Sequence, residues 1–169
     1  MLDKIILEDI LEIKSAVKGD SFEQKKVLVT GGAGFIGSWL CDVLVSYGSH
    51  VVAVDDFSTG RRRNIDHLIS NSKFELIERD ASKFITESKF DYIFHLAAHA
   101  SPDEYQTKPI ETLQASSFGT ANIAEIARRS DATMLFASTS EVYGDAEIVP
   151  TPESYWAFTR GLQPKANGK

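Results

Sequence analysis

A group of glycines follows a short apolar run near the start of the chain. Directly after residues 27–29 (VLV) come three glycines spaced three residues apart, Gly31, Gly34 and Gly37. A residue without a Cβ lets the backbone turn tightly and lie close to a bound group. A helix that begins there offers free N–H groups and a positive dipole to an anion. Strand, glycine turn and helix in this order therefore predict a pyrophosphate site, the other interpretation being a turn that serves packing alone.

An acidic residue stands where the next strand would end. Residues 50–54 (HVVAV) form a mostly β-branched run, and Asp55 follows it, eighteen positions after Gly37. This is close to the spacing at which a carboxylate accepts hydrogen bonds from an adenosine ribose. A carboxylate there also repels a 2′-phosphate, so the pattern predicts NAD rather than NADP as the ligand. The three arginines at 61–63 would weaken that preference.

Alternating strands and helices are expected to position these residues. The predicted strands are 27–29, 50–54, 73–77, 90–95 and 133–137, and the predicted helices are 38–47, a short one near 64–70, and 109–130. This alternation predicts an α/β fold, a Rossmann-type doubly wound parallel sheet of about five strands in the order 3-2-1-4-5. Ligands of such sheets bind beyond the carboxyl ends of the strands, where we find Thr30, Asp55, Asp80, Leu96 and Ser138.

We divide the chain into three parts: residues 1–25 as an N-terminal helix and linker, 26–156 as the NAD-binding domain, and 157–169 as an irregular tail. The first part is amphipathic, with apolar residues at helical spacing, Leu2, Ile6, Ile10, Ile13 and Val17. We expect this helix to pack on its own domain, with docking to a partner as the alternative. An open fifth strand would expose unpaired backbone groups, so a homo-oligomer is a further expectation.

Composition restricts the class of protein. With 169 residues, 43% of them hydrophobic and 25% charged, the chain suits one globular domain with a buried core. The net charge of −6 and the lack of a basic stripe argue against nucleic acid as a partner. No apolar run is long enough to span a bilayer, and the N-terminus carries both charges rather than a signal sequence. We therefore expect a cytoplasmic protein without a membrane partner.

Two residue types with reactive chemistry are interpreted as structural. The helix predicted at 38–47 has an apolar stripe formed by Ile36, Leu40, Val43, Leu44 and Tyr47. Cys41 lies on the apolar face of this helix, so we expect it to be buried. As a lone cysteine it forms no disulfide within the chain. His95 and His99 have a zinc-like spacing, but no third ligand is near them in the sequence, so no metal site is predicted.

Several of these segments together resemble the extended short-chain dehydrogenase/reductase family, the NAD-dependent epimerases and dehydratases. They are residues 30–37 (TGGAGFIG), Asp55, Asp80, residues 95–98 (HLAA) and residues 138–144 (STSEVYG). Within this family the UDP-glucuronate decarboxylases are most similar, through residues 100–102, Tyr105, Gln106, residues 138–141, Tyr155 and Trp156. The resemblance covers about residues 26–156.

The resemblance implies NAD as cofactor, a nucleotide sugar like UDP-glucuronate as substrate, and a role for each matching residue. The pyrophosphate is expected at Gly31, Gly34, Phe35, Ile36 and Gly37. The ribose is expected at Asp55, and the adenine at Asp80 and Ala81. The nicotinamide side is expected at Leu96, Ala97, Ala98, Ala137 and Ser138. Thr139 and Glu141 would be catalytic, near the reacting carbon of the sugar, and Tyr105 would bind the substrate.

One residue bears on the type of reaction that the resemblance implies. In such decarboxylases NAD oxidises the sugar at C4, the resulting β-keto acid loses CO₂, and the hydride returns. The related 4,6-dehydratases carry an aspartate at the position of Ser140, as the acid for the departing C6 hydroxyl. A serine hydroxyl cannot supply that proton near neutral pH, so decarboxylation is expected and dehydration is not.

The chain departs from the family at the catalytic base. The family uses the tyrosine of Tyr-x-x-x-Lys, and none of the five tyrosines here has a lysine four residues later. Ser116 stands where the family has an asparagine, and Glu111 where it has a lysine. We expect a truncated chain that lacks the C-terminal lobe and is inactive alone. The alternatives are a non-catalytic NAD-binding module and an epimerase with another base, for which Tyr143 is a candidate.

Overall fold

The structure is a computed structural model that describes residues 4–17, 22–144 and 146–155. The chain divides into two units, Met1–Phe136 and Ala137–Lys169, and the structure describes each unit by itself. Part of the predicted linker (residues 18–21), Trp156 and the tail predicted at 157–169 lie outside the described residues.

A five-stranded parallel sheet with the strand order β3-β2-β1-β4-β5 forms the centre of the first unit. Its strands are β1 (Lys26–Thr30), β2 (His50–Asp55), β3 (Phe74–Glu78), β4 (Tyr92–His95) and β5 (Thr133–Phe136). The predicted Rossmann-type fold, the five strands and their order are therefore confirmed. The third and fourth strands begin one and two residues later than predicted, and the fifth ends one residue earlier.

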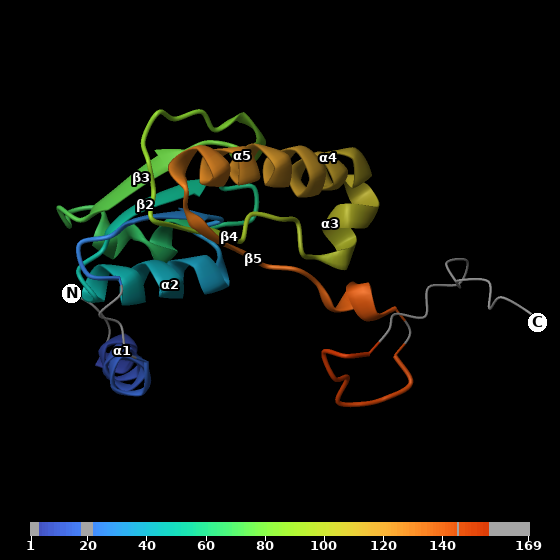
Figure 1. Cartoon of the computed structure of the whole chain (residues 1–169), viewed down its shortest axis with the longest axis horizontal. Coiled ribbons are helices and arrows are strands. Elements are labelled where there is room, and N and C mark those ends of the chain that lie inside the picture. Colours follow the sequence, from blue (N-terminus) through green and yellow to red (C-terminus); the bar gives the residue numbers. More distant parts are fainter. Residues whose placement is uncertain (1–3, 18–21, 145, 156–169) are drawn as a thin grey trace, which may run out of the picture. The chain divides into compact units, whose positions relative to one another are not determined.

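Helices cover both faces of this sheet (Figure 1). Helix α2 (Phe35–Ser46) lies on one face and α5 (Thr120–Ser130) on the other. Helix α4 (Pro109–Gln114) leads into α5 through a π-helical segment, Ala115–Gly119. The helix predicted at 109–130 is thus one helical run interrupted by a wider turn. It follows α3 (Pro102–Thr107).

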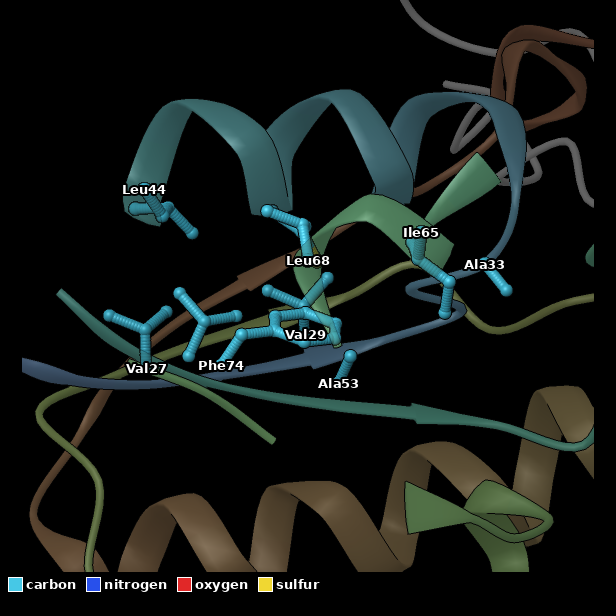
Figure 2. Close-up of a cluster of buried hydrophobic side chains, with 10 residues drawn as sticks. Val27, Val29, Ala33, Leu44, Ala53, Ile65, Leu68 and Phe74 are labelled. Atoms are coloured by element: carbon cyan, nitrogen blue, oxygen red, sulfur yellow. The ribbon is translucent and has the colours of Figure 1, made fainter. Parts of the chain in front are cut away.

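A buried cluster lies between α2 and the sheet (Figure 2). Val27 and Val29 from β1 contribute to it together with Leu44 from α2. Ile65 and Leu68 contribute to it from the connection between β2 and β3. That connection contains two short 3₁₀ turns, Arg62–Asn64 and Asp66–Leu68, so the single short helix predicted near 64–70 is wrong in type.

A second buried cluster lies between the sheet and α5. Leu28 from β1 contributes to it, together with Ile93 from β4 and Ile123 and Ile126 from α5. Strand β1 therefore packs on both of its faces. This explains why its sequence is a continuous apolar run and not an alternation of apolar and polar residues.

The buried face of α2 differs in one place from the predicted stripe. Gly37, Cys41 and Leu44 are buried, at spacings of four and three that follow one face of a helix. Ile36 is 68% exposed, so its assignment to the apolar stripe is wrong. One residue corresponds to a rotation of about 100° around the helix, which turns Ile36 away from the sheet. Cys41 is buried as predicted, and burial raises the pKa of its thiol.

The N-terminal helix is α1 (Lys4–Ala16), and it contacts the end of α2. Its Ile10 is buried, Lys14 Nζ donates a hydrogen bond to Ser46 O at 2.9 Å, and the Tyr47 hydroxyl donates to Val17 O at 2.8 Å. The helix thus packs on its own unit, as expected. Among the described residues, the structure contains no helix with both the length and the apolar character needed to cross a membrane.

Candidate functional site

The glycine loop leads from β1 to α2, and two of the three glycines spaced three residues apart, Gly31 and Gly37, have no room for a side chain. Gly31 has φ +72°, and a Cβ on it would lie 3.0 Å from Ala97 N and from Leu96 O. A Cβ on Gly37 would lie 2.0 Å from Gly31 O. The loop therefore lies directly against the segment that follows β4, and α2 begins directly against the loop. Close packing therefore requires both glycines, in addition to their part in the glycine pattern that predicts a pyrophosphate site.

Backbone N–H groups at the start of α2 form a cradle that suits an anion. Gly34 is the N-cap of α2 and, being a glycine, has no side chain to accept from the first N–H groups of the helix. The first N–H groups of a helix have no partner within the helix, and the dipole adds positive potential there. Phe35, the first helical residue, is 81% exposed, and its neighbour Ile36 is 68% exposed. This end of α2 is accessible, so its geometry fits the pyrophosphate of a dinucleotide.

Asp55 ends β2 beside this cradle, with its carboxylate buried. Its Oδ2 accepts a hydrogen bond from Ala33 N at 2.9 Å, and its Oδ1 accepts one from Phe57 N at 2.8 Å. Burial raises the pKa of this carboxyl, against the effect of these two hydrogen bonds. Each carboxylate oxygen can accept a second hydrogen bond, so Asp55 retains acceptor capacity for two hydroxyl groups. A Cβ on Gly60 would lie 2.6 Å from Oδ1.

The arginine-rich loop after β2 also holds the glycine loop. Ala33 O accepts hydrogen bonds from Arg61 N at 3.0 Å and from Asn64 Nδ2 at 2.9 Å. The Arg62 guanidinium forms an ion pair with Glu78 and lies over the Phe57 ring at 4.8 Å. One of the three arginine charges that would attract a 2′-phosphate is therefore paired. The sequence reasoning missed the role of Asn64, because no local pattern links it to Ala33.

Asp80 follows β3 and has a different environment. Its Oδ1 accepts from both Ser82 N and Ser82 Oγ at 2.8 Å, and Lys83 Nζ lies 3.5 Å from Oδ2. Partial burial opposes ionisation, but the Ser82 hydrogen bonds and Lys83 prevail and hold the pKa of Asp80 below its usual value. Ala81 O accepts a hydrogen bond from Asn122 Nδ2 of α5 at 2.8 Å. The turn predicted to meet the adenine is thus tied to α5.

A buried polar network joins the ends of β1 and β4. Thr30 Oγ1 lies 2.7 Å from His95 Nδ1, and it accepts from the backbone N of Leu96 and of Ala97, each at 3.3 Å. On the other side of the ring, His95 Nε2 lies 3.2 Å from Thr120 Oγ1. Burial lowers the pKa of His95. The sequence placed Thr30 and His95 at strand ends, but gave no signal for the contribution of Thr120 from α5.

The other predicted site residues are distributed over both units. Tyr105 lies on α3 and is half-exposed. Four of the predicted residues belong to the second unit, and their roles toward the glycine loop stay predictions: Ala137, Ser138, Thr139 and Glu141. In that unit a 3₁₀ turn, Ser140–Tyr143, follows Thr139. The described residues contain no cluster of three or more histidine, cysteine, aspartate or glutamate side chains able to hold a metal ion.

Comparisons with known proteins agree on one family. The model of the NAD dependent epimerase/dehydratase family matches residues 27–161. Over 144 residues the chain is 46% identical to UDP-glucuronic acid decarboxylase 1 of Xenopus tropicalis. This match covers 85% of this chain and 34% of that relative. The chain thus spans about a third of the length of this curated relative.

Solved structures of UDP-sugar epimerases are also similar to this chain. A UDP-galactose 4-epimerase is 41% identical with a TM-score of 0.67, over 78% of this chain and 44% of that chain. The UDP-glucose 4-epimerase of Bifidobacterium longum, solved in complex with NAD⁺ and UDP, is 25% identical with a TM-score of 0.67. That match covers 76% of this chain and 41% of the epimerase.

Proposed function

The chain belongs to the NAD dependent epimerase/dehydratase family, and on this premise we propose that it is the NAD-binding part of an enzyme that modifies a nucleotide sugar. One observation carries the proposal: the uncapped start of α2 lies beside the buried carboxylate of Asp55, which hydrogen bonds to the glycine loop. The first group suits a pyrophosphate and the second suits a ribose with two free hydroxyls. A dinucleotide presents both.

The chain's own residues would bind and orient the cofactor. Phe35, Ile36 and Gly37 would hold the pyrophosphate through backbone N–H groups at the start of α2. Gly31 and Gly34, whose own N–H groups donate to Val54 O and Gly31 O, would let the loop approach it closely. Asp55 would orient the ribose and exclude a 2′-phosphate, since a buried carboxylate repels a second negative charge. Asp80 and Ala81 would meet the adenine. The nicotinamide side would be lined by Leu96, Ala97, Ala98, Ala137 and Ser138.

For the substrate we propose a UDP-glucuronate-like sugar and a decarboxylation. NAD, when bound, would accept a hydride from C4 of the sugar and later return it. Between these two transfers the β-keto acid of the sugar would lose CO₂. Thr139 and Glu141 would act near C4, and Tyr105 would bind the sugar nucleotide. Support comes from the 46% identity to UDP-glucuronic acid decarboxylase 1. Ser140, where dehydratases carry an aspartic acid, argues in the same direction, because a hydroxyl is too weak an acid for dehydration.

Two other functions have an observation in their favour. The 169 residues contain no Tyr-x-x-x-Lys, which favours a module that binds NAD without turnover. The 41% identity to a UDP-galactose 4-epimerase favours an epimerase instead. Both share the cofactor site with the decarboxylase, so NAD binding is common to the three. Turnover of a sugar nucleotide separates them.

Calorimetric titration of the 169-residue protein with NAD tests the proposal, with NADP as the control ligand and UDP-glucuronate added afterwards. We expect NAD to bind and NADP to bind more weakly. Products are then measured from UDP-glucuronate and from UDP-glucose, first with the 169-residue protein and then with the same chain joined to a C-terminal lobe that carries Tyr-x-x-x-Lys. These products distinguish decarboxylation, epimerisation and an absence of turnover. A folded protein that binds neither dinucleotide would overturn the proposal, and the glycine loop would then serve packing alone.

A further inference from the structure

Thr30 and His95 share one hydrogen-bond network with the backbone that follows β4. They are partners in the register of β1 and β4, and both side chains are buried. The Thr30 hydroxyl faces three groups: His95 Nδ1 at 2.7 Å, and the N–H groups of Leu96 and Ala97 at 3.3 Å. The backbone of Leu96 and Ala97 also lies against Gly31 of the glycine loop. The position of this backbone segment therefore depends on Thr30.

The number of protons in this network determines the state of the histidine ring. A hydroxyl has two acceptor lone pairs and one proton. Two N–H groups point at the lone pairs of Thr30 Oγ1: that of Ala97, and that of Leu96, which is shared with Thr30 O at 3.1 Å. The hydroxyl proton is therefore donated to His95 Nδ1. The ring proton of the neutral imidazole is then on Nε2, which donates to Thr120 Oγ1 at 3.2 Å. Each polar atom of the network then has a partner of the correct kind.

We propose that neutral His95 is a positioning residue for the cofactor: through the Thr30 hydroxyl it holds the backbone of Leu96 and Ala97 where the nicotinamide side of NAD would lie. This inference rests on the proposed function, because it assumes that NAD binds at this edge of the sheet. It goes beyond that function by making the protonation state of one buried ring a condition for tight binding.

Protonation of the ring would break the network. Nδ1 would become a donor, so that three donors would face a hydroxyl that can accept two hydrogen bonds. The groups that face the ring from β1, α5 and β5 are Thr30, Thr120 and Phe136, whose ring is 5.8 Å away; none of them titrates. The proton therefore acts on the ring itself. Burial lowers the pKa of His95, so the ring is neutral and the network intact at neutral pH, and the network fails only when the pH falls below that lowered pKa.

The test is the pH dependence of NAD affinity, measured by calorimetry from about pH 7.5 down to about pH 4.5, because burial holds the pKa of His95 below the usual histidine value of about 6.5. For the wild-type protein we expect the dissociation constant to rise about three- to tenfold toward acid, as for the loss of one hydrogen bond. His95→Asn is the matched variant, because its amide oxygen can accept from Thr30 and does not titrate. We expect this variant to bind NAD at neutral pH and to lose the acid-induced weakening.

A second measurement does not depend on that variant. Nitrogen chemical shifts of the His95 ring report which nitrogen carries the proton, and we expect Nε2 at neutral pH in the wild-type protein. In Thr120→Val, which removes the acceptor for that proton, we expect a mixture of the two neutral forms and weaker NAD binding. A proton on Nδ1 in the wild-type protein would overturn the inference, as would NAD affinity that does not change with pH, or that changes equally in His95→Asn. Absence of NAD binding at neutral pH would instead refute the proposed function.

Discussion

Thr30 and His95 are register partners at the carboxyl ends of β1 and β4, and the Thr30 hydroxyl lies 2.7 Å from Nδ1 of the histidine ring. Asp55 makes a matching connection on the other side of β1, where its carboxylate accepts from Ala33 N of the glycine loop. Side chains at the ends of β4 and β2 thus hold the glycine loop from both sides. A pre-formed loop loses little conformational entropy when an anion binds, so these contacts favour affinity as well as stability.

Thr30→Val tests the contribution of the hydroxyl to stability. Valine has nearly the same shape, but it leaves His95 Nδ1 and the Ala97 N–H without their buried partner, whereas the Leu96 N–H keeps its hydrogen bond to Thr30 O at 3.1 Å. We expect the free energy of unfolding in urea to fall by about 2–4 kcal/mol, because unsatisfied buried polar groups cost about 1–3 kcal/mol each and partly relax. Thr133→Val, at an exposed position of β5, is the control and should change stability little. Equal effects of the two substitutions would contradict the role of the network.

Asp55→Asn tests the proposed ribose contact. Hydrogen bonds to a charged group contribute about 1.5–3 kcal/mol, so we expect NAD affinity to fall about ten- to a hundredfold in calorimetry. The ratio of NADP to NAD affinity should rise, because the repulsion of the 2′-phosphate is removed. A purely structural role of Asp55 would leave that ratio unchanged. Asp56→Asn is the matched control, since this neighbouring carboxylate is exposed and accepts from Ser58 N and Ser58 Oγ.

Gly37→Ala tests the close approach of α2 to the glycine loop. The added Cβ would lie 2.0 Å from Gly31 O and 2.8 Å from Gly31 C, so the backbone must move. Overpacking of this kind costs about 1–3 kcal/mol, which urea unfolding measures. At Gly119 the nearest atom to an added Cβ is Ser82 N, at 3.9 Å. We expect Gly119→Ala to retain the wild-type stability, and a Gly37→Ala protein of unchanged stability would show that the loop adapts freely.

The features that depend on local chemistry could be predicted from the sequence. Residues 27–29 are apolar on both faces because β1 is covered by α2 and by α5. Such a run indicates a central parallel strand. Asp55 at the end of β2 could be recognised from its distance to the glycines, since one crossover helix fixes that length. The strand order followed from these two features and from right-handed crossovers.

Features that depend on contacts between distant segments could not be predicted. Asn64 donates to Ala33 O across 31 positions, and Thr120 meets His95 across 25. Neither pair has a sequence signature, because asparagine and threonine are common at turns and on helices. The exposure of Ile36 was missed for a related reason: an exposed apolar residue looks the same in a sequence as one in the core.

Asp91 gives a prediction for the pH dependence of stability. Its carboxylate accepts from Lys26 N at 2.9 Å and from Lys25 Nζ at 3.0 Å, at the amino ends of β1 and β4. The backbone hydrogen bond from Lys26, followed by that from Lys25, holds the pKa of Asp91 below its usual value. A carboxyl with a depressed pKa in the folded state stabilises the protein fully above its unfolded pKa of about 3.9. That contribution is lost as the pH falls through the folded pKa.

We therefore expect Asp91→Asn to lower the free energy of unfolding by about 0.5–1 kcal/mol near pH 7, a small effect because the group is exposed. The difference from the wild-type protein should shrink as the pH falls below about 4. Glu87→Gln is the control, because the Glu87 side chain is 94% exposed and lies 3.9 Å from Arg129. A difference for Asp91→Asn that grows in acid would contradict the assigned sign.

The two halves of the helical run, α4 and α5, differ in how far their apolar side chains are buried. Ile123, in α5, is fully buried against Leu28 and Ile93, whereas Ile110, in α4, is 67% exposed. Ile123→Ala leaves a cavity and should lower the free energy of unfolding by about 2–5 kcal/mol. Ile110→Ala makes the same chemical change and should stay within about 0.5 kcal/mol of the wild-type protein. A large loss in Ile110→Ala would mean that α4 is covered in solution, for example by a second copy of the chain. Analytical ultracentrifugation of both variants would then decide whether that cover is a dimer contact.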